Sequence, residues 1–494
     1  MTRTTTKLGA PHLASEMWVS TRSKGLRVLL LILALTFAAT AHAAPKPTIL
    51  IVDCNAACDG TTLMTAAIQK AIDTAAPKGG TVTFKPGTYL TGALFLKSGV
   101  TFDIPEGVTI TGSQDIKDFP ELPTRMAGIE LTWPAALINV RDAHDVTITG
   151  KGTIDENGAI WWKVFADLSK VYVPKGLRWA VDYDAKRVRL SLIQSSYNVH
   201  YGGGLTLKRS GFWTVQILYS HDVTVDGLTI RNNEGGRGPS TDGIDIDSSH
   251  DVDISHADID GNDDALCLKS GRDSDGLRVN RPTYNVKIHD SIIRRGPAAI
   301  TIGSETSGGF HNIEAWNLTA EAGVGSGVLF KSTRMRGGNT TDIRIHDLTL
   351  TGVGIPVSMT MDWNANYRNT SLPAGTDPKN VPDYWIKLTT PVPPEQGLPH
   401  FSNVHIWNIK ATNARRAFSV SAYPNAPLIN FKFDHLDIQA ASAGSIADAQ
   451  DWAFSDIKLT TTDNSSVKVT NSTNVTGLPT APAASTPPPT PAGN

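Results

Sequence analysis

The sequence predicts an all-β fold, a single-stranded right-handed parallel β-helix, for most of its 494 residues. A repeated pattern, Asn or Asp followed by an apolar residue, recurs at intervals of 24 to 34 residues, with two intervals of 53 and 61 residues that are about twice as long. Short stretches of alternating apolar and polar residues separate Gly, Asn and Asp corners, and helical periodicity is almost absent. The pattern begins at Asp145, Asn198, Asp222, Asp251, Asn285, Asn312, Asp342, Asn403, Asn430 and Asp456.

The repeat favours a β-helix over other solenoids. Leucine-rich repeats have a similar period but require a fixed ladder of Leu and Asn or Cys, which this chain lacks. In a β-helix each repeat forms one coil, so that inward Val, Ile and Leu stack into a continuous core and outward residues line a groove. Residues 61–76 form the clearest amphipathic pattern, and we expect a short helix there that caps the first coil. The predicted domain spans residues 46–470.

Composition excludes several classes of protein. Hydrophobic residues make up 40% of the chain and charged residues 19%, which excludes a disordered chain or a collagen-like fibre. A net charge of −2 without a long basic run argues against a nucleic-acid partner. Of the three cysteines, Cys54 and Cys58 are spaced to close a small disulfide loop, whereas Cys267 lies in an apolar run and is expected in the core.

Both ends of the chain differ from the repeat. Basic residues precede an apolar run over residues 28–40, and Ala41-His42-Ala43 follows, which predicts a signal peptide over residues 1–43. The alternative, a membrane anchor, is disfavoured because spanning a bilayer takes about 20 apolar residues. The polar stretch before the basic residues favours translation from Met17.

Residues 478–494 are rich in Pro, Ala and Thr and predict a disordered tail. We expect a secreted or periplasmic protein.

Three carboxylates are predicted to converge on one face of the solenoid. Asp242 precedes an alternating run, and Asp263 and Asp264 follow about one coil later. Because stacked strands lie about 4.8 Å apart, these side chains can meet. Both members of the Asp-Asp pair reach the groove only if the chain bends, which Gly261 and Asn262 favour. Repulsion among the three raises the pKa of at least one, giving the protonated acid and the ionised base that glycoside hydrolysis needs.

Two other interpretations of these acids remain open. Paired Asp residues can simply cap corners or stay solvated. A calcium site is the second alternative, since Asp258, Asp260, Asn262 and Asp264 follow the spacing of the first ligands of an EF-hand loop. Its glycine is misplaced, however, and Lys269 stands where the bidentate Glu belongs, which leaves only a calcium site of another type.

The two acidic segments resemble the Asn-Thr-Asp and Asp-Asp motifs of glycoside hydrolase family 28, the polygalacturonases and related pectin hydrolases. Further segments follow in the order of this family, and those after Lys269 match its bacterial branch. They cover residues 59–61, 67–72, 79–89, 150–155, 210–213, 269–283, 302–305 and 331–338. The resemblance implies a parallel β-helix that hydrolyses a pectic polysaccharide with inversion and uses neither a metal nor another cofactor.

Residue roles follow from the same resemblance. Asp263 would be the general acid that protonates the glycosidic oxygen, and Asp242 and Asp264 would hold and deprotonate the attacking water. Lys331, in the basic motif of the family, would contact the substrate carboxylate, with Lys269 and Arg334 as further substrate-binding residues. The alternative for Lys331 is a solvated strand residue.

The chain departs from the family pattern at three positions. Ser240 replaces the Asn of the first motif, which is a mild change because a hydroxyl also forms hydrogen bonds. Ala298 and Leu329 stand where polygalacturonases carry His and Arg, which weakens the case for unsubstituted polygalacturonate. Arg272, Arg334 and Arg336 are candidates to compensate. A rhamnogalacturonan hydrolase, or another hydrolase of pectin side chains, is therefore the alternative within the family.

Several further expectations concern the surroundings of the acids. Residues 163–189 lack the repeat and are expected to form a loop that walls the cleft and favours attack at chain ends. Six aromatic residues are candidates for sugar stacking, although core packing is the simpler expectation for each: Trp161, Trp162, Trp179, Tyr183, Trp213 and Trp363. Outside the family, a calcium-dependent pectate lyase and a non-catalytic carbohydrate-binding β-helix share the predicted fold. We expect a monomer.

Overall fold

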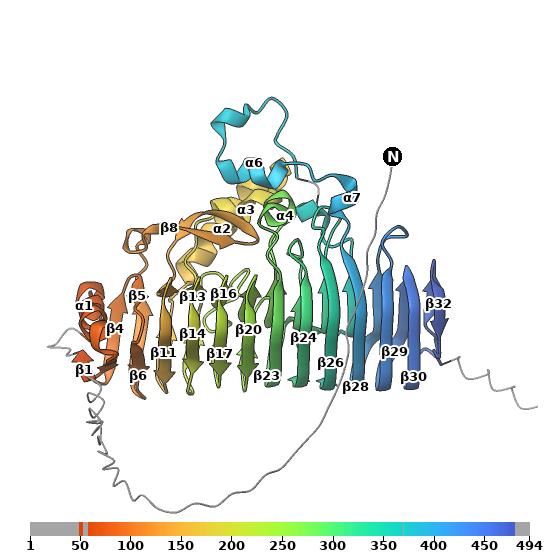
Figure 1. Cartoon of the computed structure of the whole chain (residues 1–494), viewed down its shortest axis with the longest axis horizontal. Helices are drawn as coiled ribbons and strands as arrows, with labels where there is room; N and C mark the ends of the chain where they lie inside the picture. Colours follow the sequence, from red (N-terminus) through yellow and green to blue (C-terminus); the bar gives the residue numbers. More distant parts are fainter. Residues whose placement is uncertain (1–48, 53–57, 369, 480–494) are drawn as a thin grey trace, which may run out of the picture. The chain divides into compact units, whose positions relative to one another are not determined.

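The computed structural model describes residues 49–52, 58–368 and 370–479. Within these residues the chain forms stacked coils whose strands pair in parallel, as predicted (Figure 1). The predicted signal peptide, Cys54 and almost all of the predicted tail lie outside the described residues, and so does the separate unit of residues 1–46. Cys58 is disulfide-bonded, and its pairing with Cys54 stays a prediction.

Successive coils contribute strands to three rows. The first row contains β5 (Leu94–Leu96), β10 (Ile138–Arg141), β13 (Ser191–Gln194), β16 (Val215–Leu218), β19 (Ile244–Asp247), β22 (Leu266–Lys269), the end of β23 (Thr283–Ile302), β25 (Val324–Lys331) and β27 (Ile355–Thr360). The third row contains β2 (Asp59–Leu63), β4 (Gly87–Thr91), β7 (Val108–Gly112), β12 (Thr153–Asp155), β15 (Thr206–Lys208), β18 (Thr229–Arg231) and β21 (Asp258–Asp260).

The second row runs the length of the stack, and its later strands are long because they turn the corner into a neighbouring row. It contains β1 (Ile49–Val52), β3 (Thr81–Phe84), β6 (Thr101–Ile104), β11 (His144–Gly150), β14 (Tyr197–Gly202), β17 (His221–Asp226), β20 (His250–Ser255), β23, β24 (Phe310–Ala320), β26 (Asn339–Thr351), β28 (His400–Ser421), β29 (Leu428–Ala447) and β30 (Ala449–Thr461). Two further strands, β31 (Lys468–Thr470) and β32 (Thr473–Thr476), continue the stack to Thr476.

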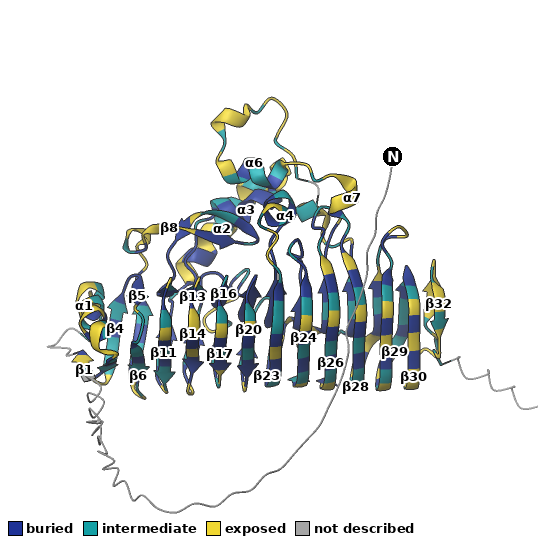
Figure 2. Cartoon of the chain, in the orientation of Figure 1, coloured by how far each residue is buried: buried dark blue, intermediate teal, exposed yellow. Residues whose placement is uncertain are grey.

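Alternation along the strands produces the core. In β17, Val223 and Val225 are buried, whereas Asp222 and Asp226 on either side are exposed, and the same striping recurs from coil to coil (Figure 2). The buried residues form one continuous cluster from Val52 to Phe454. Each buried Val, Ile or Leu side chain contributes roughly 1.5–3 kcal/mol, so this cluster is the main source of stability.

The recurring Asn and Asp residues have a conformational reason. All ten positions of the repeat adopt positive φ angles, from 50° to 57°, a region that Asn and Asp tolerate better than other residues with a side chain. Their side chains also bond from one coil to the next: Asn285 Nδ2 donates to Asp251 at 3.0 Å, and Asn312 Nδ2 donates to Asn285 at 2.8 Å. The sequence repeat therefore marks one corner of every coil.

The predicted capping helix is present but starts later than expected. The helix α1 spans Thr65–Ala75 and buries Ile68, Ile72 and Ala75 against the first coils. Its predicted first turn belongs to β2 instead, because the side chain of Asp59 accepts the backbone N–H groups of Thr61 and Thr62 at 2.8 and 3.1 Å. A 3₁₀ turn, η1 (Ala76–Lys78), follows the helix.

Insertions between the coils gather on one side of the stack, beyond the strand ends (Figure 1). They comprise the antiparallel strands β8 (Glu121–Met126) and β9 (Ile129–Pro134), the helices α2 (Ala159–Tyr172), α3 (Arg178–Asp184), α4 (Asp273–Val279), α5 (Ala365–Arg368), α6 (Asp383–Thr389) and α7 (Pro394–Gly397), and the 3₁₀ turns η2 (Ile116–Asp118), η3 (Val173–Lys175) and η4 (Pro378–Asn380).

The expectation of a loop over residues 163–189 was wrong, because most of this stretch is helical. The helices α2 and α3 pack into a second apolar cluster, in which Trp179 meets Trp385 of α6 with ring centroids 5.0 Å apart. This packing partner lies about 200 residues away in the chain, which local sequence patterns do not reveal. Among the residues described, no helix is both long and apolar enough to cross a membrane.

Candidate active site

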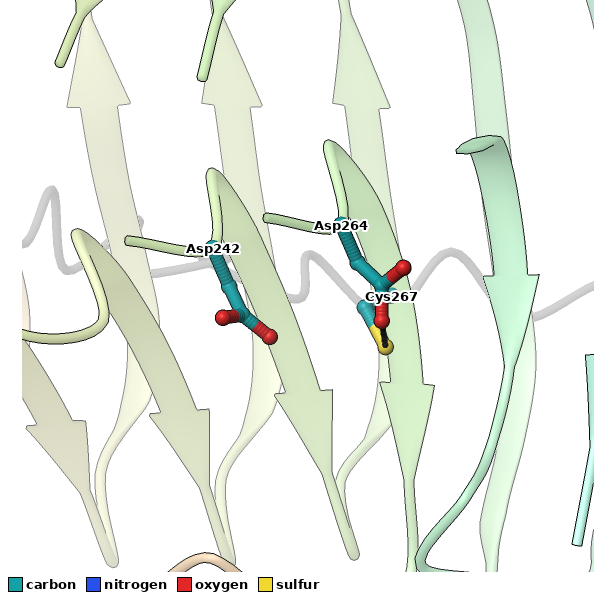
Figure 3. A group of neighbouring side chains, drawn as sticks. All are labelled: Asp242, Asp264 and Cys267. Atoms are coloured by element: carbon teal, nitrogen blue, oxygen red, sulfur yellow. Dashed lines mark hydrogen bonds between the residues drawn. The ribbon is translucent and has the colours of Figure 1, made fainter. Parts of the chain in front are cut away.

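The three predicted carboxylates stand just before two neighbouring strands of the first row. Asp242 precedes β19, and Asp263 and Asp264 precede β22, whose register pairs Ile244 with Leu266. The chain bends at residues 262–263, as predicted, and the backbone N–H of Asp264 donates to Asp263 Oδ1 at 3.0 Å. Asp242 and Asp264 consequently point to the same side of adjacent coils (Figure 3).

A cavity of about 400 Å³ contains all three carboxylates. Its floor comes from the ends of the first-row strands and its walls from the insertions. Phe165 of α2 and Arg178, Asp182 and Tyr183 of α3 line one wall, so residues 163–189 do wall the cleft, although as helices. Tyr183, Trp213 and Trp363 also line the cavity, whereas Trp161, Trp162 and Trp179 are buried elsewhere.

Two lysines hold the carboxylates in place. Lys331 Nζ donates to Asp264 Oδ2 at 2.6 Å, and Thr301 Oγ1 donates to the other oxygen at 3.0 Å. Lys269 Nζ lies 3.3 Å from Asp242 Oδ2, 3.4 Å from Asp245 Oδ1 and 3.5 Å from Glu305 Oε2. Lys269 and Lys331 are nearly buried, so they act as fixed countercharges rather than as solvated surface residues.

Burial and repulsion give the acids different pKa values. Burial, together with Asp245 and Asp263, raises the pKa of Asp242 well above its usual value. Burial and the charge of Asp264 raise the pKa of Asp263 to about 6, against the opposing pull of Lys331. Burial raises the pKa of Asp245 to about 8. Burial also acts on Glu305, but Lys269, with Arg336, Lys331 and Arg272, lowers the pKa of Glu305 to about 2. The site therefore combines protonated and ionised carboxyl groups.

Cys267 is fully buried, as expected, but it lies outside the continuous apolar cluster inside the coils. It shares the outward register position of Asp245 and Thr301, beneath the carboxylates. Its Sγ donates to the carbonyl oxygen of Gly303 at 3.2 Å and contacts Asp264 Oδ2 at 3.7 Å (Figure 3). The sequence did not indicate that Cys267 points outward, because the inward residues Leu266 and Leu268 on either side make the whole segment look apolar.

Within the described part of the chain, Asp242, Asp264 and Cys267 form a group with one possible metal-ligand atom each, all within 4.8 Å of one another. Lysine ammonium groups already pair with both carboxylates, which disfavours a divalent cation there. The EF-hand-like series does not form one site either. Asp258 forms ion pairs with Arg231 and Arg294, and Asp260 accepts from Asn233 Nδ2 at 2.6 Å.

Comparison with known proteins identifies the family. The family model of the glycosyl hydrolases family 28 matches residues 86–384, more than half of the chain. The chain belongs to glycosyl hydrolase family 28. It is therefore a glycoside hydrolase, as the motifs around Asp242 and Asp263 predicted.

Relatives and solved structures of this family agree with the fold. A probable polygalacturonase of Vitis vinifera is 31% identical over 344 residues, which cover 67% of this chain and 65% of the relative. An exo-poly-alpha-D-galacturonosidase of Dickeya chrysanthemi is 26% identical over 477 residues, which cover 87% of this chain and 77% of the relative. The family 28 exopolygalacturonase of Yersinia enterocolitica superposes with a TM-score of 0.72 at 22% identity, covering 87% of this chain and 78% of that structure.

The departures from the family 28 pattern have different structural consequences. Ser240 lines the cavity, and its hydroxyl donates to Asp182 Oδ1 at 3.3 Å. Ala298 is fully buried in β23, and Leu329 lies between Thr301 and Ser358 on neighbouring strands. Neither of them is among the residues that line the cavity.

The basic candidates are also distributed unequally. Lys269, Lys331 and Arg272 line the cavity of this family 28 enzyme. Arg334 does not, because its exposed guanidinium lies over the ring of Tyr423, 4.3 Å from the centroid. Arg336 is fully buried and forms an ion pair with Asp273 beneath the cavity.

Sequence reasoning missed four charged residues of the site: Asp245, Glu305, Arg178 and Asp182. Asp245 alternates with Ile244 and Ile246, a pattern that could have marked it as an outward residue of the same strand. Glu305 is the last residue of the segment 302–305, which resembles family 28 in sequence. No sequence signal placed α3 over the acids, because its position depends on packing against distant helices.

Proposed function

We propose that this family 28 hydrolase cleaves α-galacturonosidic bonds in a pectic polysaccharide with inversion at the anomeric carbon. The observation that carries the proposal is that Asp263 and Asp264 lie side by side in the cavity. The pKa of Asp263 is raised to about 6, and Asp264 accepts a hydrogen bond from Lys331. A carboxyl group with a raised pKa next to a carboxylate is the acid–base pair that glycosidic cleavage requires. The names of the relatives point to polygalacturonan as substrate.

The first step of the proposed reaction is proton donation. Asp263 is less buried than Asp242 and Asp264, so it is the carboxyl group best placed to reach a bound sugar. It transfers its proton to the glycosidic oxygen as the bond to the anomeric carbon breaks. The leaving sugar departs with that proton, and Asp263 becomes a carboxylate.

The attacking water is held by the other two carboxyl groups. Oxygens of Asp242 and Asp264 lie within 4.8 Å of each other, which allows one water molecule to form hydrogen bonds to both. Asp264 accepts hydrogen bonds from Lys331 and Thr301 and takes the proton of the water as it attacks. Asp242, with its raised pKa, orients this water. Attack from the face opposite the leaving group inverts the configuration.

An acidic substrate suits the basic lining of the cavity. Lys269, Lys331, Arg178 and Arg272 all contribute to it, and cationic groups recognise carboxylates through charge-assisted hydrogen bonds. Trp213 and Trp363 add aromatic faces near Lys269 and Lys331, at 4.6 and 5.0 Å from ring centroid to Nζ. The helical wall formed by α2 and α3 favours attack at chain ends.

Rhamnogalacturonan, or a side chain of pectin, is the second candidate substrate. Ala298 and Leu329 favour it, because they replace the His and Arg found in polygalacturonases. We further propose that the protein acts outside the cytoplasm as a monomer, which rests on the signal peptide predicted over residues 1–43 and on the usual behaviour of β-helices.

Purified protein incubated with polygalacturonate and with rhamnogalacturonan tests the proposal. We expect release of reducing ends from polygalacturonate and a decrease in kcat of about 10²- to 10⁴-fold in Asp263→Asn, the range typical of a lost general acid. The matched control is Asp222→Asn, an exposed corner position with a positive φ angle that Asn also adopts. Cleavage of rhamnogalacturonan alone would move the assignment to the second substrate. Equal rates for the wild type and Asp263→Asn would refute the catalytic assignment.

A further inference from the structure

Most cations of the cavity are already paired with groups of the protein. Lys331 pairs with Asp264, and Lys269 lies between three acidic side chains. Arg272 is buried and has all three guanidinium nitrogens engaged: it donates to Asp273 Oδ2 at 3.1 Å, to the Tyr183 hydroxyl at 2.9 Å and to the carbonyl oxygen of Tyr367 at 3.0 Å. These groups contribute to the basic lining, but their nitrogens are already engaged by protein partners, so they attract a substrate carboxylate less strongly than an accessible cation would.

Arg178 differs from them because it is accessible while it shares its carboxylate partner with a second arginine; Arg272 likewise shares Asp273 with Arg336, but the side chain of Arg272 is only 2% exposed. Its Nη1 lies 2.8 Å from Asp182 Oδ2, and the fully buried Arg187 lies 3.0 Å from Asp182 Oδ1. One carboxylate therefore faces two guanidinium groups, which leaves one positive charge unbalanced within this trio. The side chain of Arg178 is 24% exposed and lines the cavity, whereas that of Arg187 is 0% exposed, so the excess charge is accessible at Arg178.

The guanidinium of Arg178 is also held in a fixed orientation. It lies 5.2 Å from the ring centroid of Phe165 and 5.0 Å from that of Tyr367. The hydroxyl of Tyr367 donates to Asp182 Oδ2 at 3.0 Å, which ties the ring and the ion pair together. A planar guanidinium that is fixed before binding can form two parallel hydrogen bonds to a carboxylate without first losing side-chain entropy.

We propose that Arg178 binds the carboxylate of a galacturonate unit in the cavity and thereby selects acidic over neutral sugars. This inference rests on the proposed function and deepens it. Polygalacturonases carry an Arg at the position of Leu329 in β25, but here Leu329 has no charge and does not line the cavity. Arg178 of the helical insertion α3 supplies a positive charge in its place. The specificity of this chain for an acidic sugar then resides in α3.

Calorimetric binding to the inactive Asp263→Asn protein tests the inference separately from catalysis. Trigalacturonate and its neutral analogue, α-1,4-linked galactotriose, are titrated into Asp263→Asn alone and into the same protein with Arg178→Gln or Arg178→Lys. We expect Arg178→Gln to weaken trigalacturonate binding about 10-fold or more, because it removes a charge-assisted bidentate contact. Arg178→Lys keeps the charge and recovers part of the affinity. Binding of galactotriose stays within about twofold.

The outcomes separate the two proposals. Arg415→Gln, which changes an exposed arginine of β28 outside the cavity lining, is the matched control and leaves both affinities unchanged. Equal weakening of both ligands by Arg178→Gln, unchanged trigalacturonate affinity, or no trigalacturonate binding to Asp263→Asn at millimolar concentration would overturn the role of Arg178. Failure of the proposed function appears differently, as wild-type protein that releases no reducing ends from polygalacturonate while it still binds trigalacturonate through Arg178. Thermal unfolding of each variant shows that it is folded.

Discussion

At the residue scale, the proposed catalysis depends on similar carboxyl groups that lie in different surroundings. Asp264 accepts hydrogen bonds from Lys331 and Thr301, whereas Asp263 has its pKa raised to about 6 by burial and by the charge of Asp264. The sequence predicted the three acids because their spacing matches one coil. It named Lys269 and Lys331 as substrate-binding residues but did not predict that they pair with the acids and with Glu305, because these ion pairs span 24 to 67 residues along the chain.

The raised pKa of Asp263 predicts the alkaline side of the pH profile. The general acid must be protonated, and its folded-state pKa lies above the ordinary value, so the active form is fully populated well below pH 6 and is lost as the pH rises through about 6. We expect kcat/KM on polygalacturonate to fall about tenfold per pH unit above that point. Initial rates between pH 4 and 8 check this. A profile that stays flat to pH 7.5 would contradict the role of Asp263.

At the element scale, the corners of the coils explain why the fold was readable from sequence. The Asn and Asp repeat marks positions with a positive φ angle, and a residue with this preference at each corner fixes where one strand ends and the next begins. The helices α2 and α3 were not predicted as helices, because Trp179 and Tyr183 pack against α6, far away in sequence. Local sequence patterns therefore predict the corners of the coils but not the packing of α3 against α6.

Substitution of one corner residue measures that contribution. We expect Asn285→Ala to lower the free energy of unfolding by about 1–2 kcal/mol more than Asn285→Gly does, since alanine pays a steric cost at a φ of 53° that glycine avoids. Both variants lose the side-chain bonds to Asp251 and Asn312, so their difference isolates the backbone conformation. Urea unfolding followed by circular dichroism gives the two values. An alanine variant as stable as the glycine variant would argue against the conformational explanation of the repeat.

At the scale of the whole molecule, the coils serve as a rigid scaffold and the insertions supply the cavity wall. Residues from β22, α2, α3 and the segment before α5 meet around one site, although they are separated by up to about 200 positions. The repeat predicted the fold, the spacing of the three acids predicted their convergence, and the resemblance to family 28 added their roles. Substrate selection depends on the wall, which the structure places and the motifs do not describe.

Chelation tests whether this scaffold needs a metal ion. Ammonium groups of Lys269 and Lys331 occupy the carboxylate oxygens that a cation would need, so we expect activity on polygalacturonate to be unchanged, within about twofold, in excess EDTA. A calcium-dependent lyase would instead lose activity and would form an unsaturated product that absorbs ultraviolet light. Reducing-end assays and absorbance readings on the same samples distinguish the two.

The anomeric configuration of the first product tests the central claim most directly. Proton NMR of wild-type protein acting on polygalacturonate records the new reducing end before it mutarotates. Inversion of an α-linked substrate predicts that the β-anomer appears first, as a saturated sugar, and that Asp263→Asn forms almost none of it. Initial appearance of the α-anomer, or an unsaturated product, would contradict the assignment of Asp242, Asp263 and Asp264 as an inverting acid–base set.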